Sequence, residues 1–184
     1  PRYSRAMKLR ELGGLQAVVS DGPADAPGVI LCHGFGAPGD DLVGLAPLLK
    51  APAPLRFVFP VAPLAPPMLV GGRAWWMIDL ERLQRGSRGP RDLNQVPPGL
   101  AAARAQLSSL LDAVERELGV PGERIVLGGF SQGAMLSLDV ALHRPSPLAG
   151  LVLLSGTLIA DQDWTARLPQ RAGLPVFQSH GSED

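Results

Sequence analysis

The apolar residues of this chain fall into short runs that are separated by polar, glycine-rich or proline-rich turns. The runs have the length and the β-branched or aromatic content of buried strands. They occupy residues 15–20, 29–32, 55–60, 125–128, 148–155 and 174–179.

Helical periodicity appears in three other segments. Between residues 100 and 118, apolar residues recur at steps of three and four, which predicts an amphipathic helix that ends near Gly119. Shorter patterns of the same kind predict helices over 42–49 and 131–143. Strands that are nearly all apolar and alternate with helices predict an α/β fold, with a mostly parallel central sheet and helices on both faces.

The strongest chemical signal lies where one predicted strand meets a predicted helix. Residues 129–133 read G-F-S-Q-G and fit the pattern G-x-S-x-G. In this context a sharp strand-to-helix turn strains its serine and presents the hydroxyl oxygen above the edge of a sheet, as in the nucleophile elbow of α/β-hydrolases. The pattern can also arise by chance in a chain with 22 glycines. The strand before it and the helix after it favour Ser131 as a nucleophile.

A glycine-rich loop follows the predicted strand 29–32. Glycine lets backbone N–H groups approach a ligand closely, and in an α/β-hydrolase this loop supplies a second oxyanion donor. The alternative is an ordinary turn in which Asp40 or Asp41 caps the helix over 42–49. His33 is interpreted as a strand-end residue that hydrogen-bonds the loop rather than as a catalytic group.

The connection over 61–72 is rich in proline and in apolar residues, and two tryptophans follow it. Trp75 and Trp76 suit either the hydrophobic core or the wall of an acyl-binding site. The sequence leaves both interpretations open.

A serine nucleophile needs a base, usually histidine, and a carboxylate that orients it. On this fold the order along the chain is serine, then the acid, then histidine. Asp184 follows the predicted strand 174–179 and suits the acid; Asp161 and Asp163 are rivals, although their D-x-D pattern resembles a helix-capping turn.

None of the three histidines follows Asp184. His143 lies at the far end of the helix that Ser131 opens, roughly 18 Å away at 1.5 Å per residue. His180 lies near the acid, but the adjacent Gly181 suggests a turn that leaves the strand.

Together the motifs resemble those of a known family. They are G-F-S-Q-G, H-G-F-G-A-P-G-D-D, P-V-A-P…W-W-M-I-D and the terminal H-G-S-E-D. In this order, from about residue 15 to 184, they resemble the phospholipase/carboxylesterase family, which includes acyl-protein thioesterases and small bacterial carboxylesterases. The resemblance implies an α/β-hydrolase fold, Ser131 as nucleophile and Asp184 as the acid.

The same resemblance implies further site residues. The backbone N–H groups of Phe35 and Gln132 would form the oxyanion hole. The acyl site would be lined by Leu64, Met68, Val70, Trp75 and Trp76. Family members have F-D or similar after the tryptophan, whereas this chain has Met77-Ile78-Asp79. They also continue past the aspartate to a loop with the catalytic histidine. Residues 1–184 are therefore expected to be a single α/β-hydrolase domain that is C-terminally incomplete, and severely impaired as an enzyme.

The composition limits the classes of partner and cofactor that this protein is expected to bind. The formal net charge is zero, and the arginines between residues 82 and 91 lack interleaved aromatic residues, so no nucleic-acid partner is expected. The single cysteine, Cys32, cannot form an intramolecular disulfide. No apolar run of membrane-spanning length and no leader is visible, and a cytoplasmic location is expected. The dispersed histidines predict no metal site, and no cofactor is expected.

The expected function is a serine carboxylesterase that hydrolyses short to medium acyl esters through an acyl-enzyme at Ser131. Thioesterase and lysophospholipase activity within the same family stay open, because the same attack cleaves oxygen and sulfur esters. A non-catalytic α/β-hydrolase-like binding scaffold and a homodimer also stay open.

Overall fold

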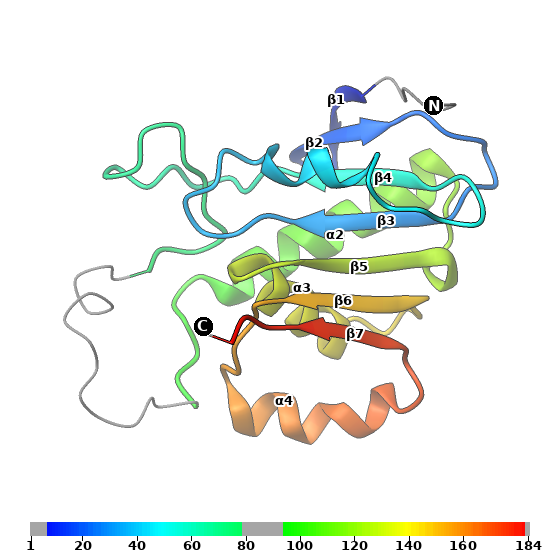
Figure 1. Ribbon diagram of the computed structural model, residues 1–184. Helices are drawn as coiled ribbons and strands as arrows, with labels where there is room; N and C mark the ends of the chain where they lie inside the picture. Colours follow the sequence, from blue (N-terminus) through cyan, green and yellow to red (C-terminus); the bar gives the residue numbers. More distant parts are fainter. Residues whose placement is uncertain (1–6, 79–93, 183–184) are drawn as a thin grey trace.

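A computed structural model describes residues 7–78 and 94–182. Seven strands form one sheet in the order β1-β2-β4-β3-β5-β6-β7 (Figure 1). They are β1 (Met7–Leu12), β2 (Leu15–Ser20), β3 (Gly28–Cys32), β4 (Arg56–Pro60), β5 (Ile125–Phe130), β6 (Gly150–Leu154) and β7 (Val176–Ser179). The strands β4, β3, β5, β6 and β7 are parallel to one another, whereas β2 pairs antiparallel with both β1 and β4. The predicted α/β class with a mostly parallel sheet is confirmed.

Helical elements connect the strands. They are η1 (Asp41–Leu45), α2 (Leu100–Leu118), η2 (Gly122–Arg124), α3 (Gln132–His143), α4 (Asp161–Arg167) and η3 (Leu168–Arg171). In Figure 1, α2 and α3 lie behind the sheet and η1 lies in front of it. The helix α4 packs beside α3, on which its Trp164 is buried.

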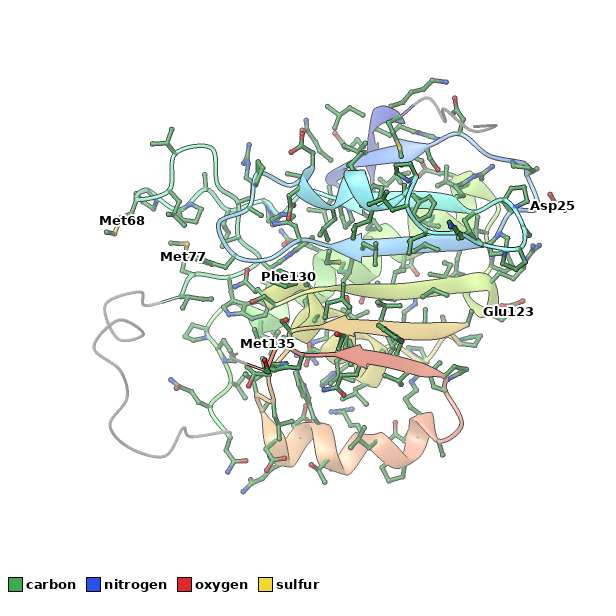
Figure 2. All side chains as sticks on the ribbon, in the orientation of Figure 1. Asp25, Met68, Met77, Glu123, Phe130 and Met135 are labelled. Atoms are coloured by element: carbon green, nitrogen blue, oxygen red, sulfur yellow. The ribbon has the colours of Figure 1, made fainter. Side chains whose placement is uncertain are left out.

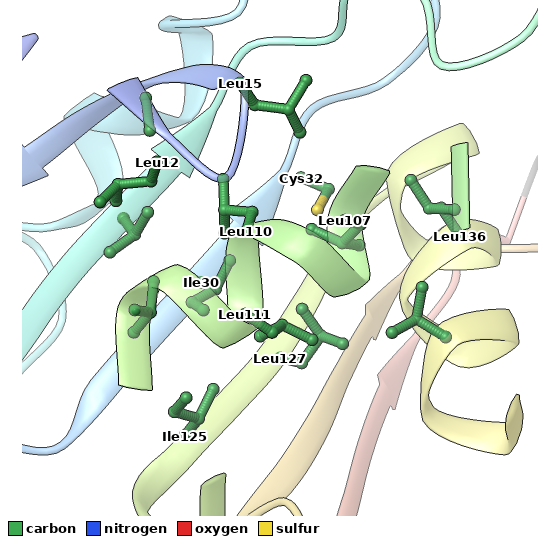
Figure 3. Packing of buried hydrophobic residues seen from close by; sticks show 14 of the residues in the cluster. Leu12, Leu15, Ile30, Cys32, Leu107, Leu110, Leu111, Ile125, Leu127 and Leu136 are labelled. Carbon is green, nitrogen blue, oxygen red and sulfur yellow. The ribbon is translucent and has the colours of Figure 1, made fainter. Parts of the chain in front are cut away.

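The core forms on the face that α2 and α3 cover. Leu107, Leu110 and Leu111 of α2 pack over the strands β3 and β5 (Figure 3). They fill the space above Ile30 and Leu127, which are fully buried. Neighbouring residues of β3 point to the opposite face, because side chains alternate along a strand. There they join a smaller cluster with phenylalanines of β4 and apolar residues of η1.

One expected element was wrong, and one strand was not expected. The helix expected over 42–49 is a single 3₁₀ turn, Asp41–Leu45, and the side chain of Asp40 makes no capping hydrogen bond. Gly44 and Pro47 explain the early end, because both disfavour helix continuation. The strand β1 was not predicted. Its residues are mostly exposed at an edge of the sheet and alternate between apolar and charged, so no buried run marks it.

The carboxyl ends of the parallel strands indicate where functional loops are expected. The parallel strands β3, β5 and β6 all end at one edge, where Phe130 lies in Figure 2 together with Met77 and Met135. Asp25 and Glu123 lie at the opposite edge. Functional loops of α/β sheets lie at the carboxyl ends of strands, so the edge near Phe130 is the place to examine for a site. Among the helices of the described residues, none is long and apolar enough to cross a membrane.

Candidate active site

Ser131 lies in the tight turn between β5 and α3. β5 ends at Phe130 and α3 begins at Gln132, so a single residue makes the turn. Its backbone has φ 51° and ψ −113°, a region that side-chain-bearing residues rarely occupy. The Ser131 N–H donates to the carbonyl oxygen of Leu154 at 2.8 Å, which ties the turn to the end of β6. The strained geometry expected of a nucleophile elbow is therefore present at this serine.

The glycines on either side of Ser131 are required by the approach of β3. A Cβ on either Gly129 or Gly133 would collide with the carbonyl oxygen of Cys32. A Cβ on Gly133 would also lie 2.6 Å from the carbonyl oxygen of His33. The helix thus begins directly against the end of the neighbouring strand.

We expect Ser131→Gly to be more stable than Ser131→Ala. Glycine adopts positive φ without the steric cost that alanine meets there, and residues in such regions store about 1–3 kcal/mol of strain. Glycine also loses more backbone entropy on folding, about 0.5–1 kcal/mol, so the net gain should be about 1 kcal/mol. Urea denaturation of the two variants measures the difference. Equal free energies of unfolding would show that the turn is not strained.

The loop after β3 presents a backbone N–H near this turn. The N–H of Gly36 donates to the carbonyl oxygen of Arg73 at 2.8 Å, and that of Ala37 donates to Gly34 at 3.4 Å. Among the described residues, no acceptor meets the N–H of Phe35. The loop lies against the end of β5, since a Cβ on Gly34 would lie 3.1 Å from the ring of Phe130.

Gln132 provides the second N–H predicted for the oxyanion hole. It is the first residue of α3, and the first N–H groups of a helix have no partner within the helix. These N–H groups also carry the positive end of the helix dipole. Because β3 and β5 are adjacent, the loop of Phe35 and the start of α3 lie at the same edge of the sheet.

His33 is a buried positioning residue, as the sequence suggested. Its Nε2 accepts a hydrogen bond from the backbone N–H of Ala62 at 3.0 Å, and its Nδ1 lies 2.8 Å from the carbonyl oxygen of Gly34. This pattern requires a neutral ring with the proton on Nδ1. Burial lowers the pKa of His33, which keeps the ring in this form.

The lowered pKa of His33 predicts a loss of stability in acid. The folded state binds this proton more weakly than the unfolded state, so stability is full above the unfolded pKa of about 6.5 and falls as the pH drops below it. We expect the free energy of unfolding to fall more steeply in wild type than in His33→Gln between about pH 7.5 and about pH 5. Denaturant titrations across this range test the difference, and parallel profiles would contradict it.

The other two histidines lie elsewhere. His143 ends α3, where its Nδ1 lies 2.8 Å from the carbonyl oxygen of Asp139 and its Nε2 lies 3.0 Å from a carboxylate oxygen of Asp163. His180 is exposed after β7. Asp184, the expected acid, lies outside the described residues. Asp161 and Asp163 lie in the first turn of α4, but the N-cap residue is Ala160 and no side chain caps the helix, so the helix-capping interpretation of their pattern was wrong.

Asp139, His143 and Asp163 place three potential metal ligands within 4.8 Å of one another. The carboxylate of Asp139, however, already accepts the indole N–H of Trp164 at 2.9 Å and lies 3.1 Å from the Nε of Arg104. Asp139 Oδ1 thus accepts a hydrogen bond, whereas the buried Oδ2 is ion-paired with Arg104 and accepts no hydrogen bond from the described residues. The group joins α4 to α3 at the end of the helix remote from Ser131.

The residues predicted for the acyl site divide into two sets. Trp75 and Trp76 are buried in the core, with 1% and 2% of their surfaces exposed. Leu64, Met68 and Val70 are exposed on the loop after β4, which projects from the sheet edge with Met68 near its end (Figure 2). None of the five lines the pocket described next.

An apolar pocket of about 190 Å³ lies beside the first turn of α3. Ala134, Met135 and Leu138 of α3 form one wall, and Gly156 and Leu158 of the loop after β6 form another. No local sequence pattern predicted this pocket. The sequence signal that could have indicated the pocket was the position of two apolar residues, Leu158 and Met135, on segments that leave the carboxyl edge of the sheet. The structure shows Leu158 exposed and Met135 half-buried.

The family model described as phospholipase/carboxylesterase matches residues 14–184. The chain belongs to the phospholipase/carboxylesterase family. Acyl-protein thioesterase 1 of Schizosaccharomyces pombe is 31% identical to it over 175 residues, which cover 91% of this chain and 72% of that protein. Acyl-protein thioesterase 1 of Mycosarcoma maydis is 34% identical over 167 residues, covering 83% of this chain and 66% of the relative.

Solved structures agree with this membership of the phospholipase/carboxylesterase family. The crystal structure of esterase PE8 has a TM-score of 0.71 and 30% sequence identity, and the match covers 85% of this chain and 69% of that one. These relatives support hydrolase activity as the general function of this phospholipase/carboxylesterase family member.

Proposed function

We propose that this protein is a serine esterase in which the hydroxyl of Ser131 attacks acyl esters. The observation that carries the proposal is the strained turn at Ser131, held at the start of a helix and beside the glycine-rich loop. A strained turn at a half-buried serine costs free energy, and such a cost suits a nucleophile.

The proposed reaction has two steps. The Oγ of Ser131 bonds to the ester carbonyl carbon, and the carbonyl oxygen becomes an oxyanion that the N–H groups of Phe35 and Gln132 stabilise. The bond to the alcohol then breaks, the alcohol takes the serine proton, and an acyl-enzyme remains. Water attacks the acyl-enzyme, releases the carboxylic acid and restores Ser131. A histidine oriented by Asp184 would carry the proton in both steps.

The pocket beside α3 offers a place for the acyl chain. It is lined mainly by apolar side chains and begins only three residues after Ser131. Its volume suits a short or medium acyl chain. The exposed apolar residues Leu64, Met68 and Val70 stay a proposal for a second acyl contact, on the loop that leaves β4 at the same edge.

Thioesterase activity is the second candidate. The curated relatives described above are named acyl-protein thioesterases, and serine attack on a thioester differs only in the leaving group. A comparison of matched oxygen and sulfur esters with the same acyl chain discriminates between the two activities.

The decisive experiment is hydrolysis of p-nitrophenyl butyrate by the 184-residue protein, with Ser131→Ala prepared identically. We expect every increment of rate above the uncatalysed reaction to vanish in the variant. A rate that survives in Ser131→Ala would exclude Ser131 as the nucleophile. Equal and negligible rates in both proteins would mean that this chain, as it stands, is not a working esterase.

A further inference from the structure

The four residues 73–76, here called the bracket segment, connect the two halves of the candidate oxyanion hole. We propose that Trp75, within this segment, is a positioning residue. It holds the N–H groups of Phe35 and Gln132 at fixed positions relative to each other. The proposal rests on the serine esterase function above and gives the buried tryptophan a role other than lining the acyl site.

The first connection runs from the bracket segment to the start of α3. The side chain of Gln132 is fully buried. Its Oε1 accepts the backbone N–H of Trp75 at 2.9 Å, and its Nε2 donates to the carbonyl oxygen of Trp76 at 2.8 Å. Both polar atoms of the carboxamide are therefore used, and they fix the residue whose own N–H is the second oxyanion donor.

The second connection runs from the bracket segment to the loop after β3. The indole Nε1 of Trp75 donates to the carbonyl oxygen of His33 at 3.0 Å. The imidazole of His33 lies near the indole, with ring centroids 5.5 Å apart. His33 is two residues before Phe35, so this bond fixes the chain just before the first oxyanion donor.

A third connection fixes the chain just after that donor. Arg73 accepts the N–H of Gly36 at 2.8 Å through its carbonyl oxygen, and its own N–H donates to Ala37 at 2.8 Å. The N–H of Phe35 thus lies between two hydrogen-bonded anchors, both on the bracket segment. Only the Trp75 anchor also contacts Gln132, so Trp75 is the residue common to both halves.

This arrangement acts on the transition state. The two N–H groups stabilise a charge that develops only as serine attacks, so a misplaced donor lowers the rate of the chemical step and leaves ground-state binding nearly unchanged. Loss of a whole oxyanion donor costs about 100- to 1,000-fold in rate. Loosening one anchor should cost less, about 10-fold.

The test uses Trp75→Phe, which removes the indole N–H and keeps an aromatic ring. Ser131 of the 184-residue protein is labelled with a fluorophosphonate: an O–P bond forms at Ser131, fluoride leaves, and the serine proton passes to solvent. Intact mass gives the rate at several probe concentrations. We expect the limiting rate to fall about 10-fold and the half-saturating concentration to change less than about twofold.

Trp164→Phe is the matched control for loss of a buried indole bond. Trp164 is as buried as Trp75 and donates to Asp139 at 2.9 Å. Amide hydrogen exchange over residues 33–37 should accelerate in Trp75→Phe and stay at the wild-type rate in Trp164→Phe. If Trp75→Phe does not fold, Gln132→Met, which breaks the same bracket from the side of α3, takes its place and should show the same two effects.

The outcomes separate the two proposals. Unchanged exchange over 33–37 or an unchanged limiting rate in Trp75→Phe would overturn the positioning role while leaving Ser131 as the nucleophile. No labelling of Ser131 relative to Ser131→Ala, even when a family-like segment with a histidine is joined to residue 184, would overturn the esterase function itself and with it the catalytic meaning of the bracket segment.

Discussion

Replacing Gly133 by alanine is expected to lower the free energy of unfolding by about 3 kcal/mol or more. The added Cβ would collide with backbone atoms of Cys32 and His33 at the end of β3. Backbone in the middle of a sheet cannot move aside as a flexible side chain can. The start of α3 would have to shift, and Ser131 would shift with it. Thermal and urea denaturation measure the loss, and Ser131 labelling should fall in parallel.

Gly44→Ala is the matched control for this change. A Cβ on Gly44 meets no atom within 4 Å, and its backbone does not have a positive φ. We expect its stability to stay within about 0.5 kcal/mol of wild type. A Gly133→Ala protein as stable as Gly44→Ala would mean that the elbow does not press on β3 as described.

The second large expected effect is on the rate of ester hydrolysis, and it concerns the histidine that acts as the base for Ser131. His33 is buried and neutral, and His143 is engaged with Asp139 and Asp163 at the far end of α3. We propose that full activity needs a further histidine beyond the three in these residues. Joining to residue 184 a family-like C-terminal segment that contains a histidine should raise the rate of p-nitrophenyl butyrate hydrolysis by about 10³-fold or more.

Two controls accompany the fused protein. The same fusion with its added histidine changed to alanine should lose the gain. His180→Ala in the 184-residue protein should leave its rate unchanged. No gain from the fusion, or loss of activity in His180→Ala, would show that the base is supplied from within the present chain.

The parts of the fold that were predictable are those with strong local signals. The amphipathic pattern of residues 100–118 predicted α2 and its end near Gly119, because one face of this helix is buried and its apolar residues therefore recur at steps of three and four. The strand-glycine-serine-helix pattern likewise located the turn at Ser131. In both cases the determining contacts are close in sequence.

The parts that were missed depend on contacts that are distant in sequence. The bond between the Trp75 indole and His33 spans 42 residues, and that between Trp75 and Gln132 spans 57. No local pattern distinguishes a tryptophan that braces two loops from one that lines a pocket. The pocket beside α3 also combines residues of separate elements, so composition and periodicity could not reveal it.

The two sides of the sheet differ in their capacity to accept another strand. On one side β1 carries the charged residues Lys8, Arg10 and Glu11, and charges of this kind discourage pairing at an open edge. On the other side β7 is the terminal strand of the described sheet, and its four residues, including Val176 and Phe177, are exposed. The described sheet is therefore asymmetric at its two outer strands: charged residues mark β1, whereas exposed apolar residues mark β7.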